Sequence, residues 1–157
     1  MNASNEGHPA GPADVYHGFI GAVNRQDLDE ATKFVDPARY RENCVGFTHG
    51  FVDWDQAKES IRRVWKGLPD LRVELAQVMA DGDVALAHGT VRGTATGRLY
   101  GAPATRRSYE ASFFDYVQVQ NGLIIERVQQ ADVLGQMRQL YGKALGLIGL
   151  DAMFMRL

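Results

Sequence analysis

Residues 107–131, RSYEASFFDYVQVQNGLIIERVQQA, form the stretch that decides the fold. Two runs rich in aromatic and β-branched residues, 107–119 and 123–131, meet at Asn121-Gly122. This residue pair is the strongest short signal for a tight turn between two antiparallel strands. The stretch is therefore predicted to be a β-hairpin.

Two more strands are predicted immediately before this hairpin. Residues 71–78, LRVELAQV, alternate strictly between apolar and polar types. Residues 81–93 follow an Asp81-Gly82 turn signal. Such period-two alternation is typical of strands that bury one face. The chain therefore contains a run of four consecutive strands, which we expect to pair antiparallel.

Three helices are predicted before the strands and one after them. The first follows Asp14, the second follows Asp27 and ends at Pro37, and the third begins at Asp53, which forms a capping-box pattern with Gln56. Helices first and strands afterwards indicate an α+β fold, with a curved antiparallel sheet wrapped around the N-terminal helices. Such a sheet leaves a cone-shaped cavity, a common type of small-molecule site.

The composition is that of one ordinary globular domain. The chain has 157 residues, of which 45% are hydrophobic and 23% charged, and its net charge of −2 gives no support for nucleic-acid binding. No apolar run approaches the roughly 18 residues that cross a membrane. The N-terminus lacks the features of a signal peptide, and Cys44 is the single cysteine. We therefore expect a cytoplasmic protein that does not bind membranes.

The ends of the chain differ in composition from its middle. We expect a disordered tail at 1–13, a single domain at 14–146 and an apolar C-terminal tail at 147–157 that either docks on the domain or contacts another subunit. The open face of a curved sheet needs a cover. A homodimer or a higher homo-oligomer is therefore expected.

Motifs for metal, phosphate and nucleophilic sites are absent from the sequence. The chain has no P-loop, no HExxH motif, no Cys/His cluster and no G-x-S-x-G motif. We therefore expect no metal site. Acid/base chemistry by scattered ionisable side chains is the simplest hypothesis.

Asp132 stands where the hairpin's second strand gives way to helical spacing. Strand alternation places it on one face with Val128 and Gln130. If that face lines the cavity, desolvation would raise the pKa of the Asp132 carboxyl and make it a proton carrier near neutral pH. Otherwise Asp132 is the N-cap of the final helix. On the residues alone both interpretations stay open.

Asp115 lies inside an aromatic strand and also has two interpretations. It is either directed inward and functional, or directed outward and paired with an arginine such as Arg127 across the hairpin. His88 and His17 are weaker candidates, because structural or solvated histidines are commoner than catalytic ones. Arg106 and Arg107 are interpreted as a solvated start of the strand.

Three stretches carry a family resemblance: AVNRQDLDEATKFV (22–35), LPDLRVELAQVMADGDVALAHGTVRG (68–93) and VQNGLIIERVQQADVLGQMRQL (119–140). With them, the chain from 15 to 141 resembles the SnoaL-like polyketide cyclase family of the NTF2-like superfamily. The resemblance implies a cone-shaped α+β barrel, an aromatic polyketide substrate of the anthracycline type, and no cofactor. It also implies that Asp132 is the acid/base group of an intramolecular aldol reaction.

The sequence departs from the family pattern near the implied site. Val128 stands where the family often has tryptophan, and Gln118 stands where ring-closing members have histidine. Because glutamine cannot carry protons, we favour ring hydroxylation together with a separate NADPH-dependent reductase, with Asp132 and Asp115 as catalytic residues. Aldol cyclisation is the alternative, and a non-catalytic small-molecule-binding module is a further one. An epoxide hydrolase would need Asp115, Arg92 and Asp132 together in the cavity.

Aromatic side chains facing the cavity would suit a flat aromatic substrate. The residues expected to contact the substrate are Tyr16, His17, Phe19, Asn43, Trp65, His88, Phe114, Tyr116, Gln118, Val128 and Gln130.

Overall fold

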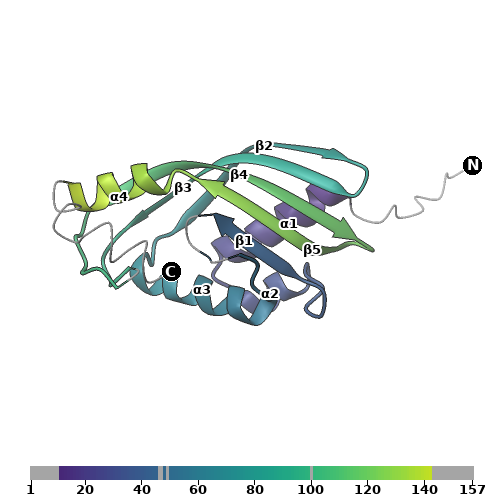
Figure 1. Cartoon of the computed structure of the whole chain (residues 1–157), viewed down its shortest axis with the longest axis horizontal. Helices are drawn as coiled ribbons and strands as arrows, with labels where there is room; N and C mark the ends of the chain where they lie inside the picture. Colours follow the sequence, from purple (N-terminus) through teal and green to yellow (C-terminus); the bar gives the residue numbers. More distant parts are fainter. Residues whose placement is uncertain (1–10, 46–47, 49, 100, 143–157) are drawn as a thin grey trace, which may run out of the picture.

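The computed structural model describes residues 11–45, 48, 50–99 and 101–142. These residues form a five-stranded sheet with helices packed on one side (Figure 1). The strands are β1 (Arg41–Val45), β2 (Arg72–Asp81), β3 (Val84–Thr94), β4 (Ser108–Gln120) and β5 (Leu123–Ala131), and the helices are α1 (Pro12–Asn24), α2 (Leu28–Thr32), α3 (Trp54–Gly67) and α4 (Val133–Tyr141). The predicted α+β class is confirmed. No helix in this part of the chain is long and apolar enough to cross a membrane.

The sheet is mixed and open, which corrects the predicted antiparallel, barrel-like sheet. β2 to β5 pair antiparallel in sequence order, whereas β1 pairs parallel with β5. The strand order β1-β5-β4-β3-β2 leaves β1 and β2 as separate edges. The sequence does not predict β1, because its five residues, RENCV, are mostly polar and show no apolar alternation.

The predicted hairpin between β4 and β5 is confirmed. Asn121 and Gly122 both have positive φ angles, of 52° and 76°, as the tight turn between two twisted strands requires. Gln120 on β4 pairs with Leu123 on β5 across this turn. The turn therefore sets the starting register of the two strands.

A β-bulge changes that register only a few residues from the turn. Val119 pairs with Ile124, but Gln118 pairs with Glu126, so β5 contains one extra residue. Because side chains alternate between the two faces of a strand, one extra residue reverses the face of everything that follows. Arg127, which a regular hairpin would direct outward, consequently lies buried on the inner face.

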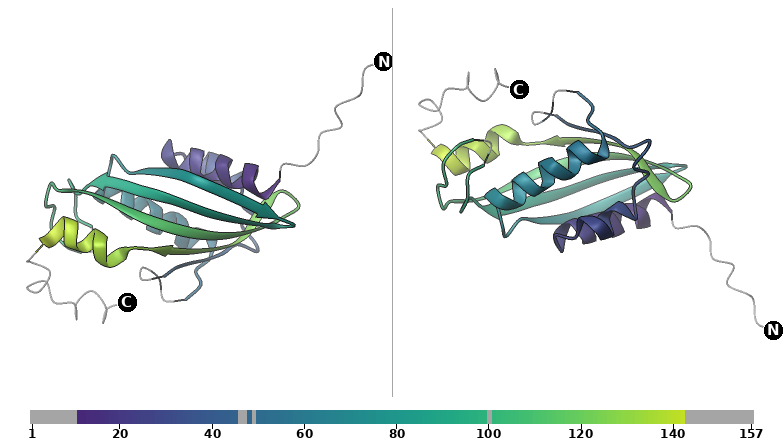
Figure 2. Two further views of the ribbon diagram at one scale, coloured as in Figure 1. Left: turned by 90° about the horizontal axis from the view of Figure 1, so that it is seen from above. Right: turned by 90° about the horizontal axis from the view of Figure 1, so that it is seen from below.

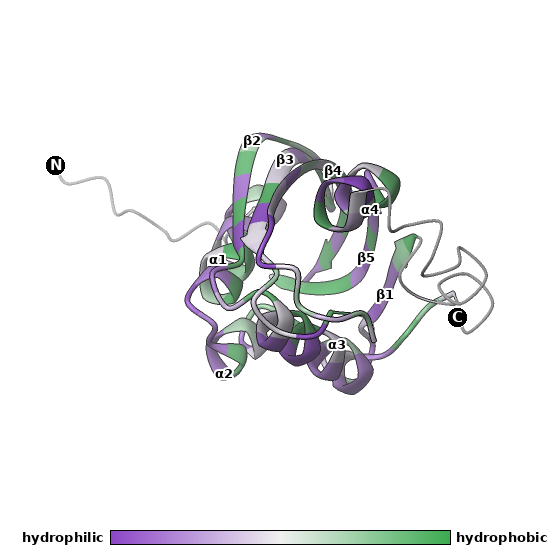
Figure 3. Cartoon of the chain, turned by 90° about the vertical axis from the view of Figure 1, so that its left-hand side faces the viewer, coloured by the Kyte–Doolittle hydropathy of each residue, from purple (hydrophilic) through white to green (hydrophobic). Residues whose placement is uncertain are grey.

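The two faces of the sheet have different surroundings. α1 and α3 lie on the same side of the sheet, whose strands arch over them (Figures 2 and 3). We call this the inner face. It carries the larger core cluster, which contains Tyr16, Phe19, Trp54, Ala87, Val117 and Ile124. Seen from above, the centre of the opposite, outer face is not covered by any described helix (Figure 2).

The helix starts agree with the sequence in two cases and differ in one. The Asp27 side chain caps α2, and Asp53 forms a capping box with Gln56 at the start of α3, as predicted. α1 begins at Pro12 rather than after Asp14, because the fixed φ angle of proline suits the first turn of a helix. Residues 12 and 13, which the sequence assigned to a disordered tail, therefore lie in α1, and residues 1–10 lie outside the described residues. The C-terminal tail, 147–157, lies outside the described residues.

Candidate active site: a buried carboxyl and its ion pairs

A chain of buried polar side chains crosses the inner face of the sheet. Arg127 on β5 donates from Nε to Asp115 Oδ2 at 2.9 Å, and its Nη2 lies 2.8 Å from the same oxygen. Its Nη1 donates to Glu42 Oε2 on β1 at 2.9 Å. Tyr16 on α1 donates its hydroxyl to Asp115 Oδ2, and Tyr40 donates to Glu42 Oε2 at 2.7 Å. One guanidinium thus joins two carboxyl groups from different strands.

The strand registers explain why these side chains meet. Glu42 is the direct register partner of Arg127 in the parallel β1–β5 pair. Val117 is the β4 partner of Arg127, so Asp115 lies two residues along the same face. Phe19 on α1 packs near the guanidinium, 5.9 Å from Arg127 Cζ to the ring centre. The apolar core around this cluster excludes water, which strengthens the charge interactions within it.

Asp115 has the properties of a proton carrier. The residue is only 2% exposed, and burial raises the pKa of its carboxyl, although the ion pair with Arg127 and the hydrogen bond from Tyr16 act in the opposite direction. Both donors bind Oδ2, whereas the buried Oδ1 has no hydrogen-bond partner among the described residues. Burial also raises the pKa of Tyr16 well above its usual value, so that its hydroxyl keeps its proton. Oδ1 is therefore the free, titratable atom of the cluster.

Two other buried polar atoms lack a partner in the described part of the chain. They are Nε1 of Trp65 on α3 and the hydroxyl of Tyr141 on α4. Buried polar groups in native proteins are rarely left without a hydrogen bond. Both residues pack into the core on the inner side of the sheet. They are candidates for contacts to a bound molecule.

Asp132, the other predicted acid, is not buried. It is exposed, and its Oδ1 accepts a 2.8 Å hydrogen bond from the amide of Gly135, which makes it the N-cap of α4. Its predicted strand face, shared with Val128 and Gln130, is the outer face of the sheet, because the β-bulge reverses the direction of these side chains. The expected desolvation of Asp132 is therefore wrong, and the helix-cap interpretation holds.

This capping role can be tested by substitution. We expect Asp132→Ala to lower the free energy of unfolding by about 1 kcal/mol, because the Gly135 amide loses its acceptor. Asp132→Asn should change it by less than about 0.5 kcal/mol, since asparagine is an equally good N-cap. Denaturant unfolding of both variants measures the difference. Equal losses in the two variants would contradict the capping role.

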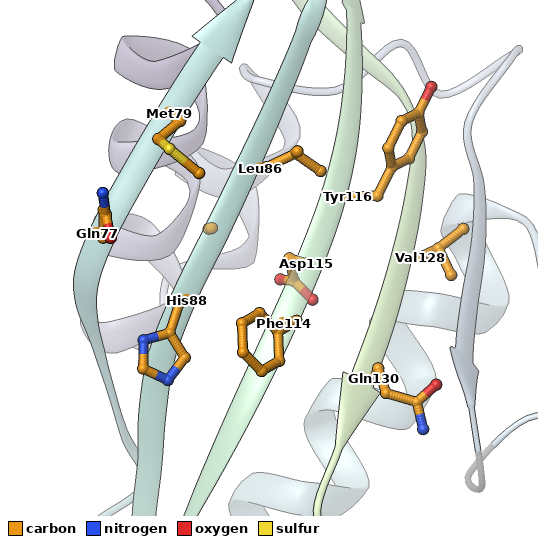
Figure 4. A pocket seen from close by; sticks show the side chains of 10 residues that line it. Gln77, Met79, Leu86, His88, Phe114, Asp115, Tyr116, Val128 and Gln130 are labelled. Carbon is orange, nitrogen blue, oxygen red and sulfur yellow. The ribbon is translucent and has the colours of Figure 1, made fainter.

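Five of the predicted substrate-binding residues line a hollow on the outer face instead (Figure 4). The hollow has a volume of about 440 Å³, and its other lining residues are Gln77, Met79, Leu86, Ala87 and Asp115. The rings of His88 and Phe114 stack there with their centres 4.7 Å apart. The five predicted residues are His88, Phe114, Tyr116, Val128 and Gln130.

The remaining predicted residues do not join this hollow. Tyr16 and Phe19 are buried on the inner side of the sheet, and Trp65 is partly buried on the same side. His17 is exposed on α1. The Asn43 side chain accepts a 3.1 Å hydrogen bond from Thr48 Oγ1, and Gln118 is not among the residues that line the hollow. The predicted substrate residues are therefore divided between two faces of the sheet and do not form one site.

The structure combines one part of each sequence interpretation of Asp115. Asp115 is directed inward and is also paired with Arg127. By contrast, the cluster of Asp115, Arg92 and Asp132 that an epoxide hydrolase would need does not form, because Arg92 is exposed and pairs with Glu74. Sequence reasoning missed Glu42, whose only signal is its place in the polar strand β1.

This α+β fold, a curved open sheet over N-terminal helices, is shared with solved structures described as SnoaL-like and NTF2-like. The family model described as SnoaL-like polyketide cyclase matches residues 13–140, and the chain belongs to that family. No curated protein sequence matches the chain.

Several solved structures share this fold. AclR from Streptomyces galilaeus, provisionally described as a hydroxylase, has a TM-score of 0.72 at 19% identity, covering 81% of this chain and 78% of its own. IdmH from Streptomyces antibioticus, provisionally described as a polyketide cyclase, has a TM-score of 0.73 at 20% identity, covering 82% and 96%. TsrD from Streptomyces laurentii has a TM-score of 0.70 at 26% identity, covering 82% and 92%. Similarity at this level establishes the fold and leaves the reaction open.

Proposed function

We propose that the chain is a cofactor-independent enzyme that modifies an aromatic polyketide, with Asp115 as its acid/base group. The observation that carries this proposal is the state of the Asp115 carboxyl. Its Oδ2 is held by Tyr16 and Arg127, its Oδ1 has no hydrogen-bond partner among the residues that the structure describes, and burial raises its pKa. A carboxyl of this kind can give and take a proton at a fixed position, away from water.

The proposed substrate lies on the inner side of the sheet, next to Oδ1. Ionised Asp115 takes a proton from an activated carbon or a phenol of the substrate, and Tyr16 and Arg127 hold the carboxyl in place. In the reverse direction the protonated carboxyl returns the proton. Phe19 and Trp65 supply aromatic surface on the same side, and the free Trp65 Nε1 can donate to a substrate oxygen.

Ring hydroxylation is our first choice of reaction. A separate NADPH-dependent reductase would supply two electrons to a quinone substrate. The resulting hydroquinone, after losing a proton to Asp115, would react with molecular oxygen. One oxygen atom would become the new hydroxyl group, and the other would leave as water as the ring returns to the quinone. The similar fold of AclR supports this choice. Aldol ring closure is the second choice, and the similar fold of IdmH supports it. Both reactions begin with the same proton transfer.

The experiment offers the purified protein two kinds of substrate. One is an anthracycline-type quinone with a reductase, NADPH and ¹⁸O₂, and the other is an uncyclised polyketide ester. Hydroxylation adds one labelled oxygen to the first, whereas cyclisation rearranges the second without an added oxygen. Tight binding of both without turnover of either would replace the enzyme proposal by a non-catalytic binding module.

We also propose that a second copy of the chain covers the outer-face hollow. Leu86, Phe114 and Met79 are 48%, 60% and 56% exposed there, which is unusual for a sheet face in contact with water. Asp115 is the one acidic residue among those that line the hollow, and its carboxyl is paired with Arg127. Glu74 and Arg92 on the neighbouring strands pair with each other. A twofold axis can therefore bring the face against itself without like charges meeting.

A matched pair of leucine substitutions tests this interface. We expect Leu86→Glu to convert the dimer to a monomer, because two buried charges would face each other across the axis. Leu134→Glu is the control, since Leu134 on α4 is 54% exposed but lies outside the hollow. Light scattering after gel filtration gives the masses. A monomeric wild type, or a dimeric Leu86→Glu variant, would contradict the proposal.

A further inference from the structure

Glu42 lies in the buried cluster but has no place in the proton transfer proposed above. The residue is 3% exposed. Its carboxylate oxygens accept hydrogen bonds from Arg127 Nη1 at 2.9 Å, from the Tyr40 hydroxyl at 2.7 Å and from the Cys44 thiol at 3.3 Å. Every one of these groups is a donor, so Glu42 is bound as an acceptor. A buried carboxyl held in this way needs an explanation beyond packing.

The charges of the cluster show what Glu42 can do. Arg127 is the one cation within the described cluster, and both Glu42 and Asp115 bind it directly. The negative charge of Glu42 balances the positive charge of Arg127. If Asp115 is ionised as well, the buried cluster carries one uncompensated negative charge, whereas protonated Asp115 leaves it neutral. An uncompensated buried charge is costly, so the neutral arrangement is favoured.

The other groups that face Asp115 do not alter this balance. Tyr16 reaches it from α1, and burial raises the pKa of that phenol well above its usual value. Cys44 and Tyr40 stand beside Glu42, and burial likewise raises the pKa of both groups well above their usual values. All three stay neutral over the ordinary pH range. Burial is the largest influence on the pKa of Asp115, and Arg127 and Glu42 are the charged neighbours that add to it, Arg127 lowering that pKa and Glu42 raising it.

We propose that Glu42 is a positioning residue that acts through Arg127, holding the guanidinium and sharing its charge so that Asp115 binds a proton more readily than it would beside Arg127 alone. This proposal rests on the proposed acid/base role of Asp115. The geometry supports a direct effect: Glu42 is the register partner of Arg127, and the two carboxyls bind opposite sides of one guanidinium, Nη1 on one side and Nε with Nη2 on the other. Removing the Glu42 charge would leave all of the positive charge of Arg127 to Asp115.

The test is a pH titration of Asp115, followed by the ¹³C chemical shift of its carboxyl in the protein without substrate. In Glu42→Gln, Asp115 should lose its proton about one pH unit or more below the wild type, because Arg127 then stabilises the ionised form without competition. Tyr40→Phe is the control: it removes a neutral donor to Glu42 but no charge, so the titration should move by much less. Glu42→Asp keeps the charge and should titrate close to the wild type.

Purely structural importance of Glu42 would give a different result. In that case Glu42→Gln would reduce stability but leave the Asp115 titration where it is in the wild type, which would overturn the proposal. All proteins are titrated in the same osmolyte buffer, which favours the compact state. If Glu42→Gln still fails to fold, a titration shift of a full unit in Glu42→Asp would overturn the proposal instead. Because no substrate is present, the outcome does not depend on whether Asp115 proves catalytic.

Discussion

Replacing Asp115 with asparagine is expected to lower the turnover rate by at least about 100-fold, the usual contribution of a positioned acid/base group. Asparagine has nearly the same shape, and its side-chain oxygen can still accept from Tyr16 and Arg127, the two donors that bind Asp115 now. The amide cannot exchange a proton at the position of Oδ1. The loss should therefore fall on turnover, with little change in substrate affinity. The loss of turnover is measured as the rate of product formation, in whichever of the two substrate assays detects product.

Asp132→Asn is the matched control for this experiment. It makes the same chemical change at the second predicted acid, which is exposed and caps α4. We expect it to keep most of the wild-type activity. Full activity in Asp115→Asn combined with a large loss in Asp132→Asn would reverse our assignment and place the chemistry on the outer face of the sheet.

Replacing Arg127 with methionine should have the largest effect on stability, a loss of about 3–5 kcal/mol in the free energy of unfolding. Methionine fills a similar volume but leaves Glu42 and Asp115 buried without a cation. Arg127 lowers the pKa of Asp115, so without it the carboxyl binds a proton more readily and the deficit should shrink as the pH falls. Denaturant unfolding at neutral and acidic pH measures both effects.

Arg92→Met provides the comparison. Arg92 also pairs with a glutamate, but the two side chains are 53% and 49% exposed, and exposed ion pairs contribute only about 0–1 kcal/mol. A loss in Arg127→Met no larger than that in Arg92→Met would show that the buried cluster is not what stabilises the inner face.

The sequence was sufficient for the elements that depend on local signals. The hairpin turn at Asn121-Gly122, the capping box at Asp53 and the helix cap at Asp27 all follow from the preferences of a few neighbouring residues. The hydrophobic alternation of β2 to β4 likewise gives a correct strand assignment. These signals were enough for the α+β class and for the order of its central strands.

The site could not be predicted because it depends on a single extra residue in β5. Alternation correctly grouped Val128 and Gln130 on one face with Asp132, but the bulge next to Gln118 decides which face that is. A regular hairpin would have placed Asp132 inward and Arg127 outward. Nothing in the local composition marks the bulge, since it forms where the strands must bend to fit the core. Of the two predicted acids, Asp132 is therefore exposed and Asp115 is the buried one.

The pairing of β1 with β5 has a consequence for how the protein is made. Glu42 and Arg127 are 85 residues apart in the chain, so β1 leaves the ribosome long before its neighbour in the sheet exists. Contacts between such distant residues form late, because a long loop must close first. Until β5 arrives, Glu42 has no counter-ion. A nascent or truncated chain that ends before β5 cannot complete the cluster, so this buried ion-pair cluster forms only when the last strand of the sheet is in place.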